Sequence, residues 1–370
     1  MLEIKEKHRC CGCGACQSIC PKHCITLSED EEGFLYPTIN QQACIKCGLC
    51  QKVCPILKPK PQIFKEPKAF ASIHNNQEIR LQSSSGGVFT ALTEYVLKSG
   101  GVVFGAGFDE NFMVCHQFVE DIDNLRKLRT SKYVQSKIGN SYQMAKKFLE
   151  ENRLVYFSGT PCQVAGLKSF LIKDYDNLIT QDVICHGVPS PLVWKKYLNH
   201  KTQNLKLTNV CFRDKKFGWR KYHISITAKT PQNQEVVYSK PFNNEPYMNM
   251  FIFNKVLRPS CHKCSFKGAG HQADITLADF WGKALKTYAP EFNDNKGCSL
   301  VLTNSSKGEE WLKKVIGQLT IKQVPVKPAL SGNPMYYKSA FKHPLRKSLM
   351  KNLQRMPFDK FIKKYGKIIF

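Results

Sequence analysis

Apolar and polar residues follow two different periods along the chain. Between residues 69 and 185, short apolar runs such as AFASIH, VVFGAGF and LVYFS alternate with amphipathic stretches such as VFTALTEYVLKS and SYQMAKKFLEEN. Strands and helices that take turns predict an α/β domain in which helices cover a mixed sheet. The later runs NVCFRD, YHISITAK and EVVYSK are less interrupted by helical segments, and they predict an antiparallel addition.

This pattern divides the chain into four parts and predicts a multidomain protein of the α+β and α/β classes. Residues 1–57 form a small head with one predicted hairpin, CITLSEDEEGFLYPTI, and residues 58–68 form a linker rich in Pro and Lys. Residues 69–325 form the larger mixed-sheet domain. Residues 326–370 form a basic, partly helical tail.

Composition restricts the possible classes of protein. The chain has 370 residues, of which 42% are hydrophobic and 23% charged, as in globular proteins. No apolar run reaches the roughly 18 residues that a bilayer-spanning helix needs. The start, MLEIKEKHRC, carries charges where a signal peptide has an apolar stretch, so we expect a cytoplasmic location. Seventeen cysteines in a reducing compartment favour metal or cluster binding over disulfides.

The formal charge of +26 attracts anions of every kind and does not choose among them. Leu345, Leu349, Leu353 and Met356 form an apolar stripe at helical spacing in the basic tail. Such a helix packs on the main domain with its lysines in water, or makes peripheral contact with an anionic membrane. Nucleic-acid binding is disfavoured, because the chain has no aromatic-rich recognition motif and no known reading helix.

Ten of the seventeen cysteines precede residue 55, and eight of them form two copies of the run C-x2-C-x2-C-x3-C-P, 34 residues apart. This run is typical of bacterial ferredoxins with two 4Fe-4S clusters, in which the fourth cysteine binds the other cluster. One cluster is therefore assigned Cys10, Cys13, Cys16 and Cys54, and the other Cys44, Cys47, Cys50 and Cys20. A zinc module is the alternative, although zinc sites usually show two pairs of ligands. Cys11 and Cys24 fit neither quartet and are interpreted as bystanders that pack as small apolar groups or lie near a cluster.

Four further cysteines stand where sites form in α/β domains. Cys162 follows Gly-Thr-Pro at a predicted helix start, Cys185 ends a predicted strand, and Cys261 and Cys264 form a C-x2-C pair. Four thiols are the complement of a third 4Fe-4S cluster, and a structural zinc site is the alternative.

Two segments are candidates for anion binding or proton transfer. Ser83, Ser84, Ser85, Gly86 and Gly87 stand directly before a predicted helix, where they leave backbone N–H groups open to an anion or simply cap the helix. Lys132 and His186 are weak candidates for catalysis, because a loop lysine is usually solvated and a structural histidine is at least as common. No G-x-G-x-x-G stands between a strand and a helix, so a Rossmann dinucleotide site has no support.

Together, the ferredoxin-type head, SSSGG, TSKYVQS, GTPCQVAGLK, CHGVPSP, the lone C-x2-C pair and ADITLADFWG resemble the beta subunits of coenzyme F420 hydrogenases and dehydrogenases. The resemblance covers roughly residues 1 to 325. It implies an iron-sulfur flavoprotein with a cluster near GTPCQ and with FAD at SSSGG and at SKYVQS. The cofactor contacts so implied are Ser83, Ser84, Ser85, Gly86, Gly87, Ser131, Lys132, Thr160 and Gln163.

The expected function is an oxidoreductase that takes single electrons from ferredoxin or a partner subunit through its clusters. FAD would then exchange two electrons with a small organic substrate or coenzyme. The main alternative is a non-catalytic electron-transfer subunit of a larger redox complex. A third hypothesis, an iron-sulfur nucleic-acid binder, predicts steeply salt-dependent binding to DNA or RNA.

Overall fold

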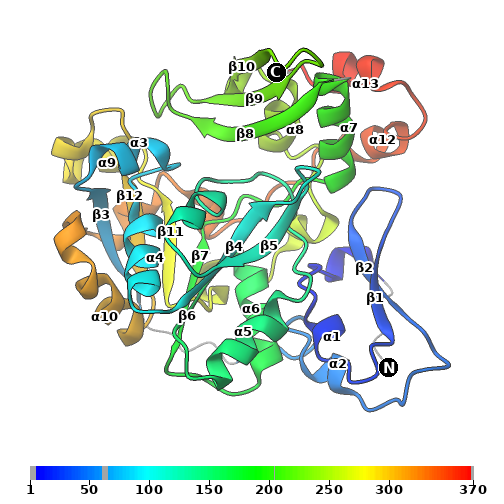
Figure 1. The fold of residues 1–370 in the computed structure, drawn as a ribbon, viewed down its shortest axis with the longest axis horizontal. Helices are drawn as coiled ribbons and strands as arrows, with labels where there is room; N and C mark the ends of the chain where they lie inside the picture. The colour runs from blue at the N-terminus through cyan, green and yellow to red at the C-terminus, as the bar shows by residue number, and fades with distance from the viewer. Residues whose placement is uncertain (1–5, 61–65, 204, 368–370) are drawn as a thin grey trace.

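The larger domain is built on an eight-stranded mixed sheet (Figure 1). A computed structural model of the chain describes residues 6–60, 66–203 and 205–367. The strand order is β13-β3-β12-β11-β7-β6-β4-β5, with β4, β6, β7 and β11 parallel and antiparallel partners on both sides. The strands span Lys68–His74 (β3), Val102–Phe108 (β4), Val114–Val119 (β5), Val155–Ser158 (β6), Leu178–Val183 (β7), Ile275–Asp279 (β11), Ser299–Thr303 (β12) and Leu319–Val324 (β13).

Side chains alternate between the two faces of this sheet, and each face has its own helices. Phe104 and Phe157 pack with α5 and α6, whereas Val103 and Tyr156 pack with α4 and α10. These two layers confirm the predicted α/β arrangement. The helices of the domain span Gln77–Gln82 (α3), Val88–Lys98 (α4), Ser141–Glu150 (α5), Pro161–Leu171 (α6), Gly282–Tyr288 (α9), Ser306–Lys314 (α10) and Val326–Leu330 (α11).

The head lies beside α5 and α6 (Figure 1). It contains the predicted hairpin, formed by β1 (Ile25–Glu29) and β2 (Leu35–Ile39), and two one-turn helices, α1 (Ala15–Ser18) and α2 (Leu49–Lys52). Residues 61–65 of the predicted linker lie outside the described residues, and β3 begins at Lys68.

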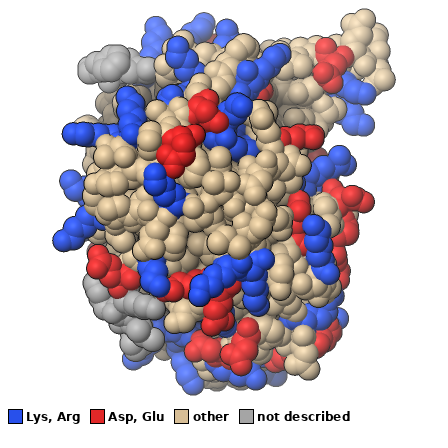
Figure 2. Space-filling model, turned by 90° about the vertical axis from the view of Figure 1, so that its left-hand side faces the viewer, with Lys and Arg blue, Asp and Glu red and all other residues tan. Residues whose placement is uncertain are grey.

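The face opposite the head includes α9 and α10. On this face Lys and Arg side chains are interspersed with Asp and Glu around a largely uncharged centre (Figure 2). The large basic excess therefore does not gather into one continuous patch here. Within the described ranges, no helix combines the length and apolar composition needed to cross a bilayer.

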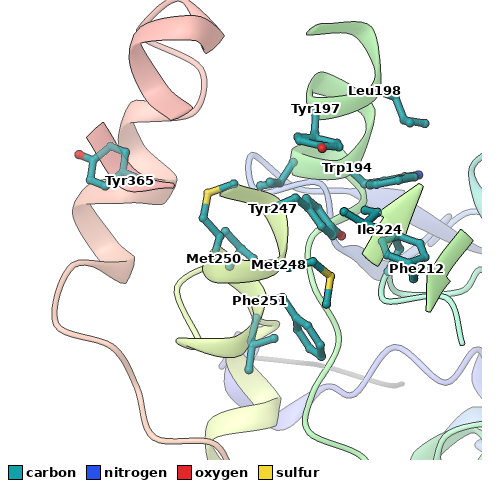
Figure 3. Packing of buried hydrophobic residues seen from close by; sticks show 14 of the residues in the cluster. Trp194, Tyr197, Leu198, Phe212, Ile224, Tyr247, Met248, Met250, Phe251 and Tyr365 are labelled. Atoms are coloured by element: carbon teal, nitrogen blue, oxygen red, sulfur yellow. The ribbon is translucent and has the colours of Figure 1, made fainter. Parts of the chain in front are cut away.

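The predicted antiparallel addition forms a separate three-stranded sheet, β8 (Lys206–Asp214), β9 (His223–Lys229) and β10 (Glu235–Pro241), so it does not extend the main sheet. Its inner side packs on α7 (Pro191–Thr202) and α8 (Pro246–Ile252) around Trp194, Phe212 and Tyr247 (Figure 3). Stacked and edge-to-face rings fill this second core; the centroids of Trp194 and Phe212 are 4.8 Å apart.

The basic tail packs on this second core and also holds the head. It forms two helices, α12 (Arg346–Asn352) and α13 (Phe358–Tyr365), separated at Pro357, and Leu349 and Leu353 are buried. Two residues of the stripe considered for membrane contact are thus covered by the protein itself, whereas Leu345 is exposed and Met356 half-buried. Arg346 forms an ion pair with Glu32 of the head hairpin.

Candidate redox site

Five head cysteines line one cavity of about 390 Å³: Cys11 and the quartet assigned to the first cluster, Cys10, Cys13, Cys16 and Cys54. The chain can wrap around this space because Gly14, before the third cysteine of the run, has φ +80°. Burial raises the pKa of the Cys16 thiol to about 12. A bound iron reverses this preference, because a metal-bound thiol is deprotonated. The size of the cavity and the four thiols of the quartet fit a 4Fe-4S cluster.

The second head quartet lies further out. Cys20 packs against Cys44 and Cys50, whereas Cys47 is exposed. Cys24, interpreted above as a bystander, lies in this group with its Sγ 3.3 Å from that of Cys20. The exposure of Cys47 makes this group the more accessible of the two.

A third group of thiols gathers inside the larger domain. Cys162, Cys185, Cys261 and Cys264 line one cavity of about 450 Å³. They come from the first turn of α6, the segment after β7 and the short turn Pro259–Lys263. Three elements that are distant in sequence therefore converge on one space at the end of the parallel strands, where open α/β sheets place their sites.

The surroundings of these thiols suit an iron-sulfur cluster. The Thr160 Oγ1 is 3.1 Å from the Cys162 Sγ, and the Val188 N–H donates to the Cys261 Sγ at 3.5 Å. Hydrogen bonds to ligand sulfurs are one of the factors that set cluster potentials. Burial raises the pKa of Cys261 to about 12 and that of Cys185 above its ordinary range. Within the described ranges, no group of three or more His, Cys, Asp and Glu has the geometry of a site for a single metal ion.

The inner head cavity and the body cavity share part of their walls. Glu6, Arg9, Cys11 and Ile56 line both. The Cys11 side chain lies next to that of Cys13 on one side and that of Cys162 on the other. It therefore lies at the junction between the two candidate cluster sites.

Arg258 also joins head and body, and it is fully buried. Its guanidinium donates to the Cys10 carbonyl and the Leu35 carbonyl of the head, both at 2.9 Å, and to the Gln135 Oε1 of the body at 2.9 Å. The charge also lies 4.3 Å from the ring centroid of Tyr36. A permanent cation is thereby held near the thiols of both cavities.

The two segments implied for FAD lie side by side. The Ser131 N–H donates to the Ser84 Oγ at 2.8 Å, and Arg213 donates to the Ser84 carbonyl at 3.0 Å. Lys132 is half-buried, with its ammonium 5.8 Å from the ring centroid of Phe108, and this ammonium donates to the backbone carbonyls of Arg129 and Thr130.

Lys132 and Lys215 form no ion pair with a carboxylate among the described residues, whereas Arg213 is paired with Asp279 at 2.8 Å. Burial lowers the pKa of Lys132 to about 7, and no carboxylate contributes to that shift. Burial likewise lowers the pKa of Lys215 to about 7; its ammonium donates to the Ser85 carbonyl at 2.9 Å. The Nε atoms of Arg129 and Arg213 are buried without a hydrogen-bond partner among the described residues. Such donors fit a phosphate-bearing ligand, because an anion would satisfy them and restore the charge of Lys132.

The remaining polar groups of the implied FAD contacts are bonded within the chain. The Ser83 and Ser85 hydroxyls donate to the Ile79 and Cys298 carbonyls. A Cβ on Gly86 would lie 2.3 Å from the Ser72 carbonyl oxygen, and one on Gly87, where φ is +96°, 2.8 Å from the His74 Cβ. These two glycines are explained by packing of the protein on itself.

Thr160 and Gln163 form a capping box at the start of α6, as expected for a Thr before a helix that begins with Pro. The Gln163 Oε1 accepts from the Thr160 N–H at 3.0 Å, and its amide donates to the Ser136 carbonyl at 3.2 Å. These bonds position Cys162 and tie α6 to the end of the SKYVQS segment.

Aromatic rings connect the body cavity with the Lys132 segment. His186 lines the cavity, and its Nε2 is 2.6 Å from the Asn254 Oδ1. Its ring meets Phe251 edge-on at 5.1 Å, and Phe251 stacks on Tyr133 at 4.8 Å. The two weak catalytic candidates, His186 and Lys132, therefore stand at opposite ends of a short row of rings.

Sequence patterns did not predict three cations of this site, because they belong to no recognisable motif: Arg213, Lys215 and Arg258. His116 was also missed; its Nδ1 is 2.7 Å from the Ser136 Oγ, and burial lowers its pKa to about 4. For Cys11 the signal existed, since it adjoins the first cysteine run, but its contact with Cys162 depends on how the head docks.

Comparison with known proteins agrees with this geometry. Residues 152–328 match the family model for the C-terminal part of the beta subunit of coenzyme F420 hydrogenase/dehydrogenase, and residues 9–56 match the 4Fe-4S dicluster domain. The class is therefore an iron-sulfur oxidoreductase. Residues 152–328 are therefore similar to the C-terminal part of these beta subunits, and a region similar to the 4Fe-4S dicluster domain precedes them.

Among solved structures, a chain of the F420-reducing NiFe hydrogenase complex from Methanosarcina barkeri, studied as a xenon derivative, is similar to this one. It is 18% identical, with a TM-score of 0.49, over 82% of this chain and 93% of that chain. No curated protein matches the chain.

Proposed function

We propose that this chain is an iron-sulfur flavoprotein that passes electrons from a redox partner to FAD for two-electron reduction or oxidation of a small organic substrate or coenzyme. The observation that carries the proposal is the shared wall between the inner head cavity and the body cavity. Two groups of four thiols separated only by such a wall suit one-electron transfer from head to body.

In this proposal the chain holds three 4Fe-4S clusters and one FAD. When bound, the clusters carry single electrons and the flavin couples them to two-electron chemistry. Cys162, Cys185, Cys261 and Cys264 would hold the third cluster, and Lys132, Ser84 and Ser131 would hold phosphate groups of FAD. Arg213 and Lys215 support that segment by binding the carbonyls of Ser84 and Ser85.

His186 would be the residue closest to proton chemistry at the body cavity. Its Nε2 meets the Asn254 amide oxygen, so that nitrogen carries the proton and Nδ1 remains an acceptor. Burial lowers the pKa of His186, which keeps the ring neutral at physiological pH. A neutral imidazole near a two-electron carrier can accept a proton during the reaction, and in its resting state it adds no charge to the site.

The composition of the purified protein tests the cofactor content. Anaerobic purification with iron, sulfide, zinc and flavin analysis should give about twelve irons and one FAD per chain, from three clusters of four irons. Eight irons without flavin would contradict the proposal. Zinc in place of the third group of four irons would identify a structural metal site.

Turnover by the isolated chain separates the enzyme from the alternative, a non-catalytic electron-transfer subunit. An enzyme exchanges electrons between an artificial one-electron donor and a small molecule unaided, whereas a relay subunit needs its partner. The family name makes coenzyme F420 the first substrate to assay, beside other hydride acceptors. A cytoplasmic location belongs to the same proposal and fits seventeen cysteines that are all free thiols.

A further inference from the structure

The two halves of the head can be compared position by position, because the cysteine run repeats after 34 residues. Cys11 and Gly12 of the inner loop correspond to Ile45 and Lys46 of the outer loop. The two loops have the same local backbone but different surroundings: Gly12 has φ +70° and Lys46 has φ +55°. Where equivalent positions of the two loops carry different residues, the difference therefore reflects the different neighbours of each loop.

The inner loop is closed against the body. A Cβ on Gly12 would lie 2.8 Å from the Gln135 Nε2 and 2.9 Å from the Arg258 Cζ, so a side chain there would displace these two groups, and the φ of +70° also favours glycine. Cys11, one residue earlier, contacts Cys162 of the next candidate cluster. The position one residue after the first cysteine is thus the contact through which the inner loop reaches another redox centre.

The outer loop has the same shape and is open. Ile45 is 57% exposed, and Cys47 is the one exposed cysteine among the described residues. A Cβ on Gly48 would meet nothing within 4 Å. Lys46 occupies the position that is glycine in the inner loop, and no described residue pairs with its ammonium.

The charge around the outer loop has one sign. From Gly33 to Phe64 the sequence contains no Asp or Glu and has lysines at 46, 52, 58 and 60. Four acidic residues of the head, at 29–32, lie instead at the hairpin turn, where Asp30 and Glu31 pair with Lys7, and Glu6 lies before the first cysteine run beside His8. The exposed proposed ligand Cys47 is therefore flanked in sequence by lysines and by one apolar side chain, that of Ile45.

We propose that the outer loop, residues 44–52, is the docking surface for a small acidic iron-sulfur electron carrier. The inference rests on the proposed function in taking the head as the entry point for electrons. In each encounter the reduced carrier is oxidised by one electron and the outer head cluster is reduced by one, with no bond or proton transferred. Ile45 contacts the carrier where Cys11 contacts the body.

Charge and size select this partner. A second copy of this chain would be repelled from the loop, because its formal charge of +26 has the same sign as the lysines there. The single exposed apolar side chain in the loop suits the small, polar interfaces of transient redox encounters, below about 1,200 Å² in total. Positive loop and acidic carrier attract one another, so the association rate should depend on salt.

The test is stopped-flow reduction of the anaerobic holoprotein by a reduced small acidic bacterial ferredoxin at increasing ionic strength. Lys46→Glu/Lys52→Glu should lower the second-order rate constant at low salt by about 10-fold or more, and the difference should vanish at high salt. The matched control, Lys283→Glu/Lys313→Glu, changes the net charge equally on α9 and α10, on the side away from the head, and should stay within about 2-fold.

Photoreduction by a small reductant should be equal in all three proteins, which shows that the clusters are intact. Equal slowing by both double variants would show only a net-charge effect and overturn the proposal, as would no slowing by either. A tight complex insensitive to salt would instead indicate a stable partner subunit and also overturn it. Because the readout is reduction of the head clusters, the result does not depend on flavin or turnover.

Discussion

The side chain of Cys11 lies next to that of Cys162, across the boundary between the head and the larger domain. The same thiol also lies next to Cys13, so it stands between a proposed ligand of the inner head cluster and a proposed ligand of the third cluster. Once both neighbours are iron-bound thiolates, a single S–H can donate to only one of them. We therefore expect Cys11 to act as a positioning residue that changes the potential of one cluster relative to the other.

Replacement of this thiol should shift a cluster potential without loss of iron. Cys11→Ala removes the donor and should make the potential of the accepting cluster more negative, by up to about 59 mV, a tenfold change in the equilibrium constant for one electron. Cys11→Ser keeps an O–H donor and should restore most of the shift. Redox titration followed by EPR measures both potentials.

Iron analysis distinguishes the possible failures of this prediction. If both variants lose four irons and keep eight, Cys11 is itself a ligand. If twelve irons remain and neither potential moves in Cys11→Ala, the thiol only fills space.

Gly166 allows the head to approach α6 closely. A Cβ at this position would lie 2.9 Å from the Cys13 Cβ and 2.7 Å from the Tyr142 Oη. Gly166→Ala should therefore displace the head and lower the free energy of unfolding by about 1–3 kcal/mol, although alanine favours helices. Magnetic coupling between the inner head cluster and the body cluster should weaken in EPR spectra. Gly317→Ala is the control, because nothing lies within 4 Å of its added Cβ; equal stability of the two variants would contradict the packing argument.

Arg258 should matter both for stability and for potential. Arg258→Met leaves the carbonyls of Cys10 and Leu35 and the Gln135 side chain without their donor, which should cost at least about 2 kcal/mol in denaturant unfolding. Loss of the cation should also make the neighbouring cluster potentials more negative, whereas Arg258→Lys keeps the charge and should shift them less.

Arg153→Met gives the matched control for Arg258. Arg153 pairs with Glu120 at the surface and should contribute about 0–1 kcal/mol. If Arg258→Met resembles this control in both stability and potentials, Arg258 has no special role at the junction.

Local sequence patterns predicted those parts of the molecule that depend on local structure. The spacing of the head cysteines places Cys54 with Cys10, Cys13 and Cys16, and the strand-to-helix transition places Cys162 at the first turn of α6. Arg258 could not be found in this way, because its role depends on head carbonyls more than 200 residues away in sequence. The tail stripe was only partly predicted, since periodicity does not show the break at Pro357 or the core that covers Leu349.

The half-buried lysine of the proposed flavin segment predicts a dependence of ligand affinity on pH. Because burial lowers the pKa of Lys132 to about 7 in the free protein, the ammonium is largely neutral at pH 9. A bound phosphate favours the charged form and raises this pKa, so binding above pH 7 requires proton uptake. Affinity for FAD should therefore be highest below pH 7 and fall as pH rises toward the pKa of the complex.

Titration of the flavin-free protein with FAD from pH 6 to 9.5, followed by flavin fluorescence, measures this dependence. Lys132→Met should weaken binding at pH 6 by about 10-fold, the value of one charge-assisted hydrogen bond, and flatten the pH profile. Lys137→Met, five residues along on the exposed surface, should change neither. A profile in Lys132→Met that still falls above pH 7 would assign the titration to Lys215, whose pKa burial also lowers to about 7. Unchanged affinity at every pH would remove Lys132 from the phosphate site, because an ammonium held beside a bound anion must contribute to binding.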